Sequence, residues 1–151
     1  MWQKKTIKNR HMKTTYFVIA TVITVLMSSS FICSSVSQSG KMGDEFYNYL
    51  KNNDYNSIVA MLDTEALVEY SKEEWIELFA SRNKFFGELK SYKNIGFHTN
   101  SSKGMEITKL SYEVNNPNGL VYEEIEFVKR GDDYKILVYR FATDLAALKG
   151  N

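Results

Sequence analysis

Cysteine, proline and histidine are scarce in this chain, and each scarcity excludes a class of protein. Among 151 residues there is one cysteine, Cys33, so no disulfide can staple the fold and zinc sites built on several cysteines are excluded. One proline and a hydrophobic content of 44% argue against collagen-like or disordered chains. Of the two histidines only His98 follows residue 39, which excludes the common two-histidine zinc sites there.

Motifs for phosphate binding and nucleophilic catalysis are also missing. The sequence contains no glycine-rich phosphate loop, no Gly-x-Ser-x-Gly element and no internal repeat. Residues 1–39 hold five basic and no acidic residues, whereas residues 40–151 hold 14 basic and 18 acidic ones. A mildly acidic body lacks the basic face that nucleic-acid phosphates require. We therefore expect no nucleic-acid partner, no metal site and no cofactor.

The first 39 residues are typical of an export signal. Four lysines and Arg10 precede an apolar or threonine-containing run over residues 16–27, and small serines follow that run. We interpret residues 1–39 as a basic segment, a signal peptide and a linker, and residues 40–151 as one domain. Met12 is an alternative start, because translation from there would leave a compact basic segment.

Two other fates of this segment stay open. If residues 16–33 are counted as one stretch, they reach the lower limit of about 18 residues for a membrane span. The domain is then a membrane-anchored one that faces away from the cytoplasm, with residues 16–33 as its only membrane contact; otherwise it is periplasmic or extracellular. Lipidation at Cys33 is disfavoured, because Ile32 and Ser30 do not match the small and aliphatic residues that lipoprotein signals place there.

Helical patterns dominate the first half of the domain. Residues 39–42 are interpreted as a linker and residues 64–70 as a connector. Apolar side chains at helical spacing predict two short helices: Phe46, Tyr47 and Leu50 in the first, Ile58, Met61 and Leu62 in the second.

The third helix has the clearest local signal. Ser71 and Glu74 form a capping box, in which each side chain can bond the other residue's backbone amide. Gly87 stands where a C-terminal glycine would end the helix. The residues that line one side at helical spacing are Trp75, Leu78, Phe79, Arg82, Phe85 and Phe86. We expect this side to lie on a sheet.

After Gly87 the apolar pattern changes to the period of strands. Four strands are predicted, joined by short turns that make them antiparallel neighbours. In the second strand the apolar residues change parity, which predicts a β-bulge near Thr108 or Lys109. The last strand, residues 134–141, is apolar at both parities, which is typical of a strand covered on both faces. One helical turn is predicted over residues 144–149.

The order of elements predicts an α+β fold in which about three N-terminal helices pack on a strongly bent four-stranded antiparallel sheet. Residues 43–142 resemble the nuclear-transport-factor-2-like (cystatin-like, cone-shaped) superfamily, in particular small secreted bacterial members of unknown function. The resemblance rests on this order, on Phe85-Phe86-Gly87-Glu88-Leu89 and on the closing Gly-Asp-Asp-Tyr-Lys-Ile hairpin at 131–136. It implies a sheet curled around the long helix, a cavity at its open end, and often a homodimer through the outer sheet face.

No set of side chains matches an active member of that superfamily, so no catalytic residue is assigned. The weak candidates for ligand binding are Tyr112, Tyr139, His98 and Tyr122. Asp54 and Asp63 are of the right type for proton transfer, but Asp54 is better interpreted as the start or cap of the second helix, and Asp63 as the end of that helix and the beginning of the connector. Three glutamates of the third strand, Glu123, Glu124 and Glu126, are interpreted as a solvated face.

These observations favour an exported, non-catalytic binding or assembly domain. It would hold a small apolar ligand or a protein partner through its cavity or sheet face. One alternative is a proton-transfer enzyme of the isomerase or cyclase/hydratase type on the same scaffold, which requires an ionisable side chain deep in the cavity. Another is a membrane-tethered accessory domain.

Overall fold

The computed structural model describes residues 37–102 and 104–149, which belong to the compact unit Val36–Asn151. The predicted signal, Cys33 and the alternative start at Met12 lie outside the described residues. Within the described residues, no helix is both long and apolar enough to cross a membrane.

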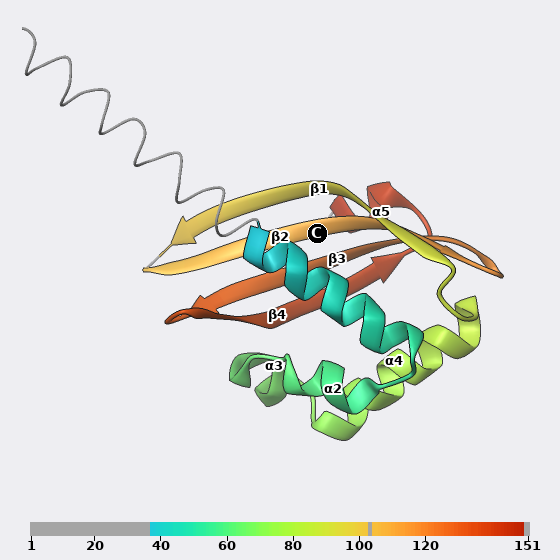
Figure 1. The fold of residues 1–151 in the computed structure, drawn as a ribbon, viewed down its shortest axis with the longest axis horizontal. Coiled ribbons are helices and arrows are strands. Elements are labelled where there is room, and N and C mark those ends of the chain that lie inside the picture. The colour runs from blue at the N-terminus through green and yellow to red at the C-terminus, as the bar shows by residue number, and fades with distance from the viewer. Residues whose placement is uncertain (1–36, 103, 150–151) are drawn as a thin grey trace, which may run out of the picture. The chain divides into compact units, whose positions relative to one another are not determined.

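The chain forms the expected α+β order, with helices before an antiparallel sheet (Figure 1). A first helix covers residues 37–51 and is called here the N-terminal helix. It is followed by α2 (Tyr55–Ala60), α3 (Thr64–Glu69) and α4 (Lys72–Phe86), and a short α5 (Leu145–Lys149) comes after the sheet. The turn predicted for the C-terminal residues is thus confirmed.

The linker and connector predictions are wrong. Residues 39–42 lie inside the N-terminal helix, and Ser39 on its inner side is fully buried. The segment interpreted as a connector forms α3, because the Asp63 side chain accepts a hydrogen bond from the Glu65 amide and caps it. Four helices, rather than about three, therefore precede the sheet in the described part of the chain.

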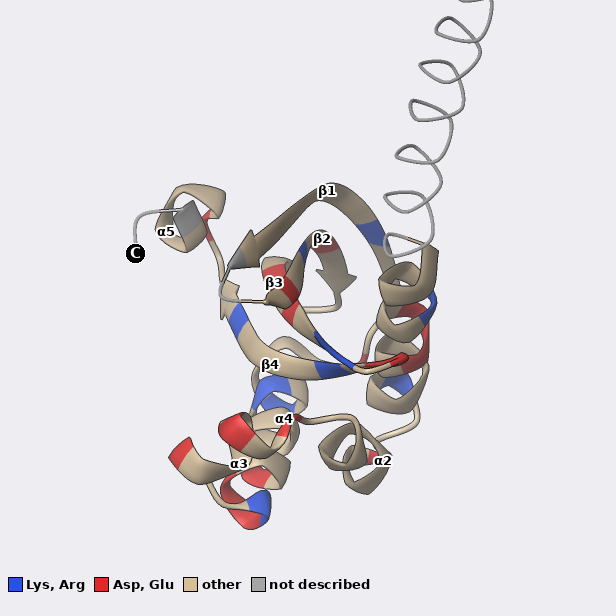
Figure 2. Ribbon diagram, turned by 90° about the vertical axis from the view of Figure 1, so that its left-hand side faces the viewer, with Lys and Arg blue, Asp and Glu red and all other residues tan. Residues whose placement is uncertain are grey.

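The sheet is a meander with strand order β1-β2-β3-β4. Its strands are β1 (Ser91–Ser102), β2 (Met105–Asn116), β3 (Gly119–Arg130) and β4 (Asp133–Ala142), and every neighbouring pair is antiparallel. We call the face that carries Leu110, Tyr112 and Val114 the inner face, since these side chains are buried under the helices. Figure 2 shows the strands curling, with the N-terminal helix on one side of the sheet and α5 on the other.

The irregular points of the sheet lie elsewhere than predicted. Strand β2 pairs with β3 without interruption, and buried Thr108 continues its inner row. The pairing instead skips Ile95 in β1 and Leu137 in β4. A bulge at Leu137 moves the inner row from Tyr134 and Ile136 to Tyr139, which explains why the last strand is apolar at both parities. Strand β4 lies at the edge of the sheet.

Helix α4 has the ends that the sequence predicts. The Ser71 hydroxyl accepts from the Glu74 amide at 3.3 Å, and the Glu74 carboxylate accepts from the Ser71 amide at 2.7 Å. Gly87 ends the helix with a φ of 83°, a value that side chains rarely adopt. The Pro117 ring packs on that glycine, and the Asn118 amide donates to the Phe86 carbonyl. The β2–β3 turn therefore holds the C-terminal end of α4.

The core lies between the helices and the inner face. Phe46 and Tyr47 of the N-terminal helix and Phe79 of α4 are fully buried there. The N-terminal helix comes close to the sheet at Gly43, where a Cβ atom would collide with the Tyr112 hydroxyl group. Burial of such aromatic side chains is the main source of stability for a domain without disulfides.

Candidate functional site

An arginine–glutamate pair is completely buried between α4 and β3. The Arg82 Nε and Nη2 atoms both donate to Glu123 Oε1, at 2.9 and 2.6 Å, and neither side chain is exposed. Arg82 lies on the inner side of α4, seven residues after Trp75. Glu123 lies in the inner row of β3 between Val121 and Ile125. Helical and strand geometry thus direct both charges into the core.

Further polar groups complete this pair. Tyr47 donates its hydroxyl to Glu123 Oε2 at 3.0 Å, and Arg82 Nη1 donates to Asn116 at 3.0 Å and to Asn83 at 2.9 Å. Burial raises the pKa of the Glu123 carboxyl, and the Arg82 guanidinium and the Tyr47 hydroxyl act in the opposite direction. The hydrogen-bond capacity of both charges is largely used, as a buried ion pair requires.

The prediction of a solvated face is therefore wrong for Glu123, and also for Glu124, which is buried on the outer face. Glu124 and Glu126 lie on that face, where Lys109 and Arg140 pair with both of them, and Glu124 is 6% exposed. The sequence contained a signal for the difference, since Glu123 shares the parity of Val121, Ile125 and Phe127. Only a buried partner could stabilise it there, and that partner comes from another element.

Tyr139 lies beside the buried pair. Its ring packs against Phe46 and Phe79, each with ring centroids 5.3 Å away. Burial and the nearby charge of Glu123 raise the pKa of the Tyr139 hydroxyl well above its usual value. Within the described residues this buried hydroxyl has no hydrogen bond of good geometry.

A groove of about 520 Å³ runs along one flank of α4, and Tyr139 forms part of its wall. We call it the α4 groove. Tyr70 and Trp75 contribute two more aromatic side chains, and Leu78 adds an aliphatic one. The polar residues of the wall are Glu74, Glu77 and Ser81. The groove wall is thus mostly apolar and aromatic and also carries two acidic side chains.

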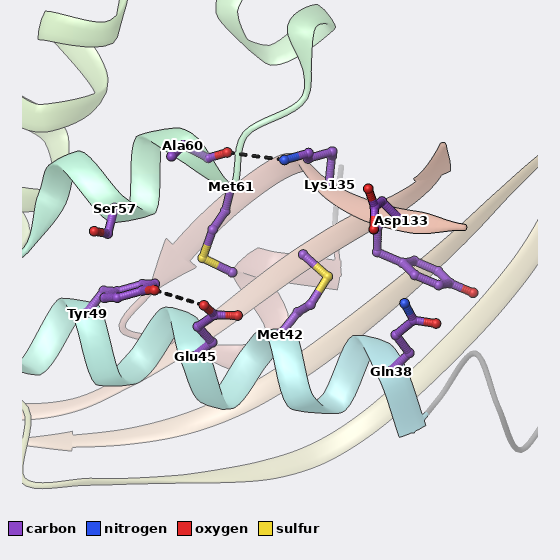
Figure 3. A pocket seen from close by; sticks show the side chains of 10 residues that line it. Gln38, Met42, Glu45, Tyr49, Ser57, Ala60, Met61, Asp133 and Lys135 are labelled. Atoms are coloured by element: carbon purple, nitrogen blue, oxygen red, sulfur yellow. Dashed lines mark hydrogen bonds between the residues drawn. The ribbon is translucent and has the colours of Figure 1, made fainter. Parts of the chain in front are cut away.

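A second pocket, of about 410 Å³, lies between the N-terminal helix, α2 and the start of β4 (Figure 3). Its wall is more polar, and its own residues bond one another. Glu45 accepts from the Tyr49 hydroxyl at 2.8 Å, and Lys135 donates to the Ala60 carbonyl at 3.3 Å. These internal bonds leave it less suited to an apolar ligand than the α4 groove.

The four residues predicted to bind a ligand do not come together. Tyr112 and Tyr139 lie on the inner face, and Tyr112 lines a smaller pocket of about 370 Å³ beside the N-terminal helix. His98 pairs with Lys109, and Tyr122 pairs with Glu113, so both lie on the outer face. Of the four, Tyr139 alone lines the α4 groove.

Asp54 has the structural role expected of it, whereas Asp63 caps a helix where the sequence predicts a connector. Asp54 caps α2 by accepting from the Ser57 amide at 3.2 Å. Asp63 caps α3, is 3% exposed, and accepts from Arg130 Nε at 2.8 Å. Neither of them lines the α4 groove. In the described ranges no three potential metal-ligating side chains lie close enough together to hold an ion.

No family model matches this chain, and comparison with curated proteins finds no significant match either.

Proposed function

We propose that this chain is an exported, non-catalytic binding domain that holds a small apolar ligand in the α4 groove. The observation that carries the proposal is the groove itself, with Trp75, Leu78 and Tyr139 in its wall. Its volume of about 520 Å³ is within the range of roughly 300–1,000 Å³ common for small-molecule sites. An apolar ligand would gain free energy there by leaving water.

We also propose a family and a location for this binding domain. The curled meander with helices over one face is consistent with the cone-shaped nuclear-transport-factor-2-like superfamily, which we propose as the family. Export is proposed from the basic and apolar character of residues 1–39. A homodimer through the outer face, a protein partner and a membrane-tethered accessory domain remain alternative forms of the same binding role.

A proton-transfer enzyme is the second candidate, and one observation favours it. Tyr139 is in the wall of the α4 groove and also next to buried Glu123. A ligand in the groove would therefore lie one side chain away from an ionisable carboxyl. The Arg82–Glu123 pair weighs against this role. A carboxylate that accepts two hydrogen bonds from a guanidinium is a poor proton acceptor.

Blocking the groove tests the binding proposal. Ser81 is exposed and lines the groove, so Ser81→Phe would fill it without disturbing the buried side of α4. In the full chain we expect this change to weaken binding of N-phenyl-1-naphthylamine, a neutral apolar dye, by roughly tenfold, or about 1.4 kcal/mol. Dye fluorescence reports the binding.

Ser101→Phe is the matched control. It places the same ring at an exposed position of β1, at the opposite edge of the sheet from β4. Both variants keep the apolar residues 16–27, so dye bound there cancels in the comparison. Equal binding by the two variants would place the apolar ligand outside the α4 groove and refute the proposal.

A further inference from the structure

The charge of the α4 groove is of one sign. Its two charged wall residues, Glu74 and Glu77, are both acidic. Neither carboxylate forms an ion pair within the described residues, in contrast to the glutamates at positions 65, 123, 124 and 126. The groove therefore presents uncompensated negative charge next to an apolar wall.

The fold accounts for one of these two acids. Glu74 belongs to the capping box, and the hydrogen bond from the Ser71 amide lowers the pKa of its carboxyl, which stays ionised at neutral pH. Glu77 lies one turn further along α4, beyond the capping interactions, and is exposed. Like charges three residues apart repel each other slightly on a helix, so the arrangement does not favour the empty protein.

The aromatic side chains of the wall suit a positive ligand as well. The Tyr70 and Trp75 rings meet edge to face with centroids 5.8 Å apart. Trp75 donates its indole N–H to the Ala66 carbonyl at 3.2 Å. A ligand in the groove can therefore contact the Trp75 ring but not bond to this N–H. The faces of tyrosine and tryptophan rings attract cations, and most strongly where water is excluded.

We propose that the α4 groove recognises an organic cation: a small amphiphile with an ammonium group and an apolar chain. The ammonium group lies by Glu74, Glu77 and the half-exposed Tyr70 ring. The apolar chain lies along Trp75, Leu78 and the Tyr139 ring, of which Trp75 and Tyr139 are buried. This inference rests on the proposed binding function and adds the charge of the ligand to it.

Three probes with the same chain length test the proposal: octyltrimethylammonium, octanol and octanoate. The full chain carries a Trp2→Phe change so that Trp75, the other of its two tryptophans, is the fluorescent reporter. We expect the cation to bind roughly tenfold more tightly than octanol and octanoate to bind most weakly, as desolvated cation–ring and ion-pair contacts imply. Calorimetric titration checks the stoichiometry.

The variant Glu77→Gln tests whether the cation is attracted by the carboxylate in the groove or by the net charge of the protein. We expect it to weaken binding of the cation by about three- to tenfold and to leave binding of octanol unchanged. Glu73→Gln is the matched control, because Glu73 is an exposed acid of the same helix that does not line the groove. Glu77→Asp, which keeps the charge, should retain most of the preference.

The outcomes distinguish this inference from the proposed function. If the three probes bind equally in the groove, the binding function stands and the cation preference is refuted. An equal loss in Glu73→Gln and Glu77→Gln would also refute it, because the attraction would come from net charge alone. If no probe perturbs Trp75, both the inference and the proposed function fail.

Discussion

Two arginine–carboxylate pairs in this domain have similar geometry and opposite surroundings. Arg82 and Glu123 are 2.6 Å apart and both 0% exposed, in the middle of the core. Arg130 and Asp63 are 2.8 Å apart, but the arginine side chain is 36% exposed at the end of β3. The first pair joins α4 to the sheet, and the second attaches the start of α3.

The difference shows that burial, more than geometry, decides how such a pair contributes to stability. At Glu123 the loss of water opposes ionisation and leaves the pKa of the carboxyl raised, because the hydrogen bonds from Arg82 and Tyr47 offset only part of it. At Asp63 the hydrogen bonds from Arg130 outweigh desolvation and lower the pKa of the carboxyl. The Arg82–Glu123 pair is therefore hard to break, and the Arg130–Asp63 pair, in which only the arginine is partly exposed, is sensitive to acid.

Removing the buried carboxylate should have the largest effect. We expect Glu123→Ala to reduce the free energy of unfolding by about 3–5 kcal/mol at neutral pH, because Arg82 keeps its charge in the core without a partner. Urea unfolding followed by tyrosine and tryptophan fluorescence measures it. A loss below about 1 kcal/mol would mean that water reaches Arg82 and that the pair is not buried in solution.

The double variant Arg82→Met/Glu123→Leu is the control for this interpretation. It removes both charges and keeps apolar volume, so we expect it to be more stable than Glu123→Ala. Tyr47 and Asn116 then lose a partner, which leaves part of the loss in place. A double variant that is less stable than the single one would show that packing, and not charge, explains the effect.

The partly exposed Arg130–Asp63 pair should tolerate change much better. Asp63→Asn keeps an oxygen that can cap α3 and removes only the charge. We expect a loss of no more than about 1 kcal/mol at neutral pH, because water screens Arg130 and Glu65 also binds it at 2.6 Å. The same urea titration gives the value, and a loss as large as that of Glu123→Ala would contradict the comparison.

The smallest effect is a dependence of that loss on pH. The pKa of Asp63 in the folded protein lies below its ordinary value of 3.8, so its contribution is present above pH 3.8 and is lost as the pH falls through the lowered pKa. The difference between wild type and Asp63→Asn should therefore shrink in acid. Unfolding measured at several pH values checks this, and a difference that grows in acid would contradict it.

Strand β4 shows why part of the fold could not be predicted from the sequence. In some strands the apolar residues shift from odd to even positions, or the reverse. Such a shift is ambiguous, because it arises either from a bulge or from a strand with apolar side chains on both faces. In β2 the change was interpreted as a bulge, yet Met105 lies on the outer face near Arg130. In β4 it was interpreted as two covered faces, yet the pairing skips Leu137. The partner strand decides between the two.

The candidate site was predictable only in part. Tyr139 was a candidate from its residue type, and the structure places it in the wall of the α4 groove. Tyr112, His98 and Tyr122 were candidates for the same reason, and they lie elsewhere. Glu74 and Glu77 were not candidates, because a helix surface with acids at its start has no need of a ligand. Their position beside Tyr139 depends on how α4 lies against β4.

The sequence by itself determined the local features of this protein. The capping box at Ser71, the glycine that ends α4, the helix cap at Asp54 and the meander of four strands all follow from neighbours within a few residues. Such features are local because the hydrogen bonds that define them connect residues close in sequence. Only the tertiary structure decided that Glu123 is buried against Arg82, 41 residues away, since a charge enters a core only where a distant partner meets it.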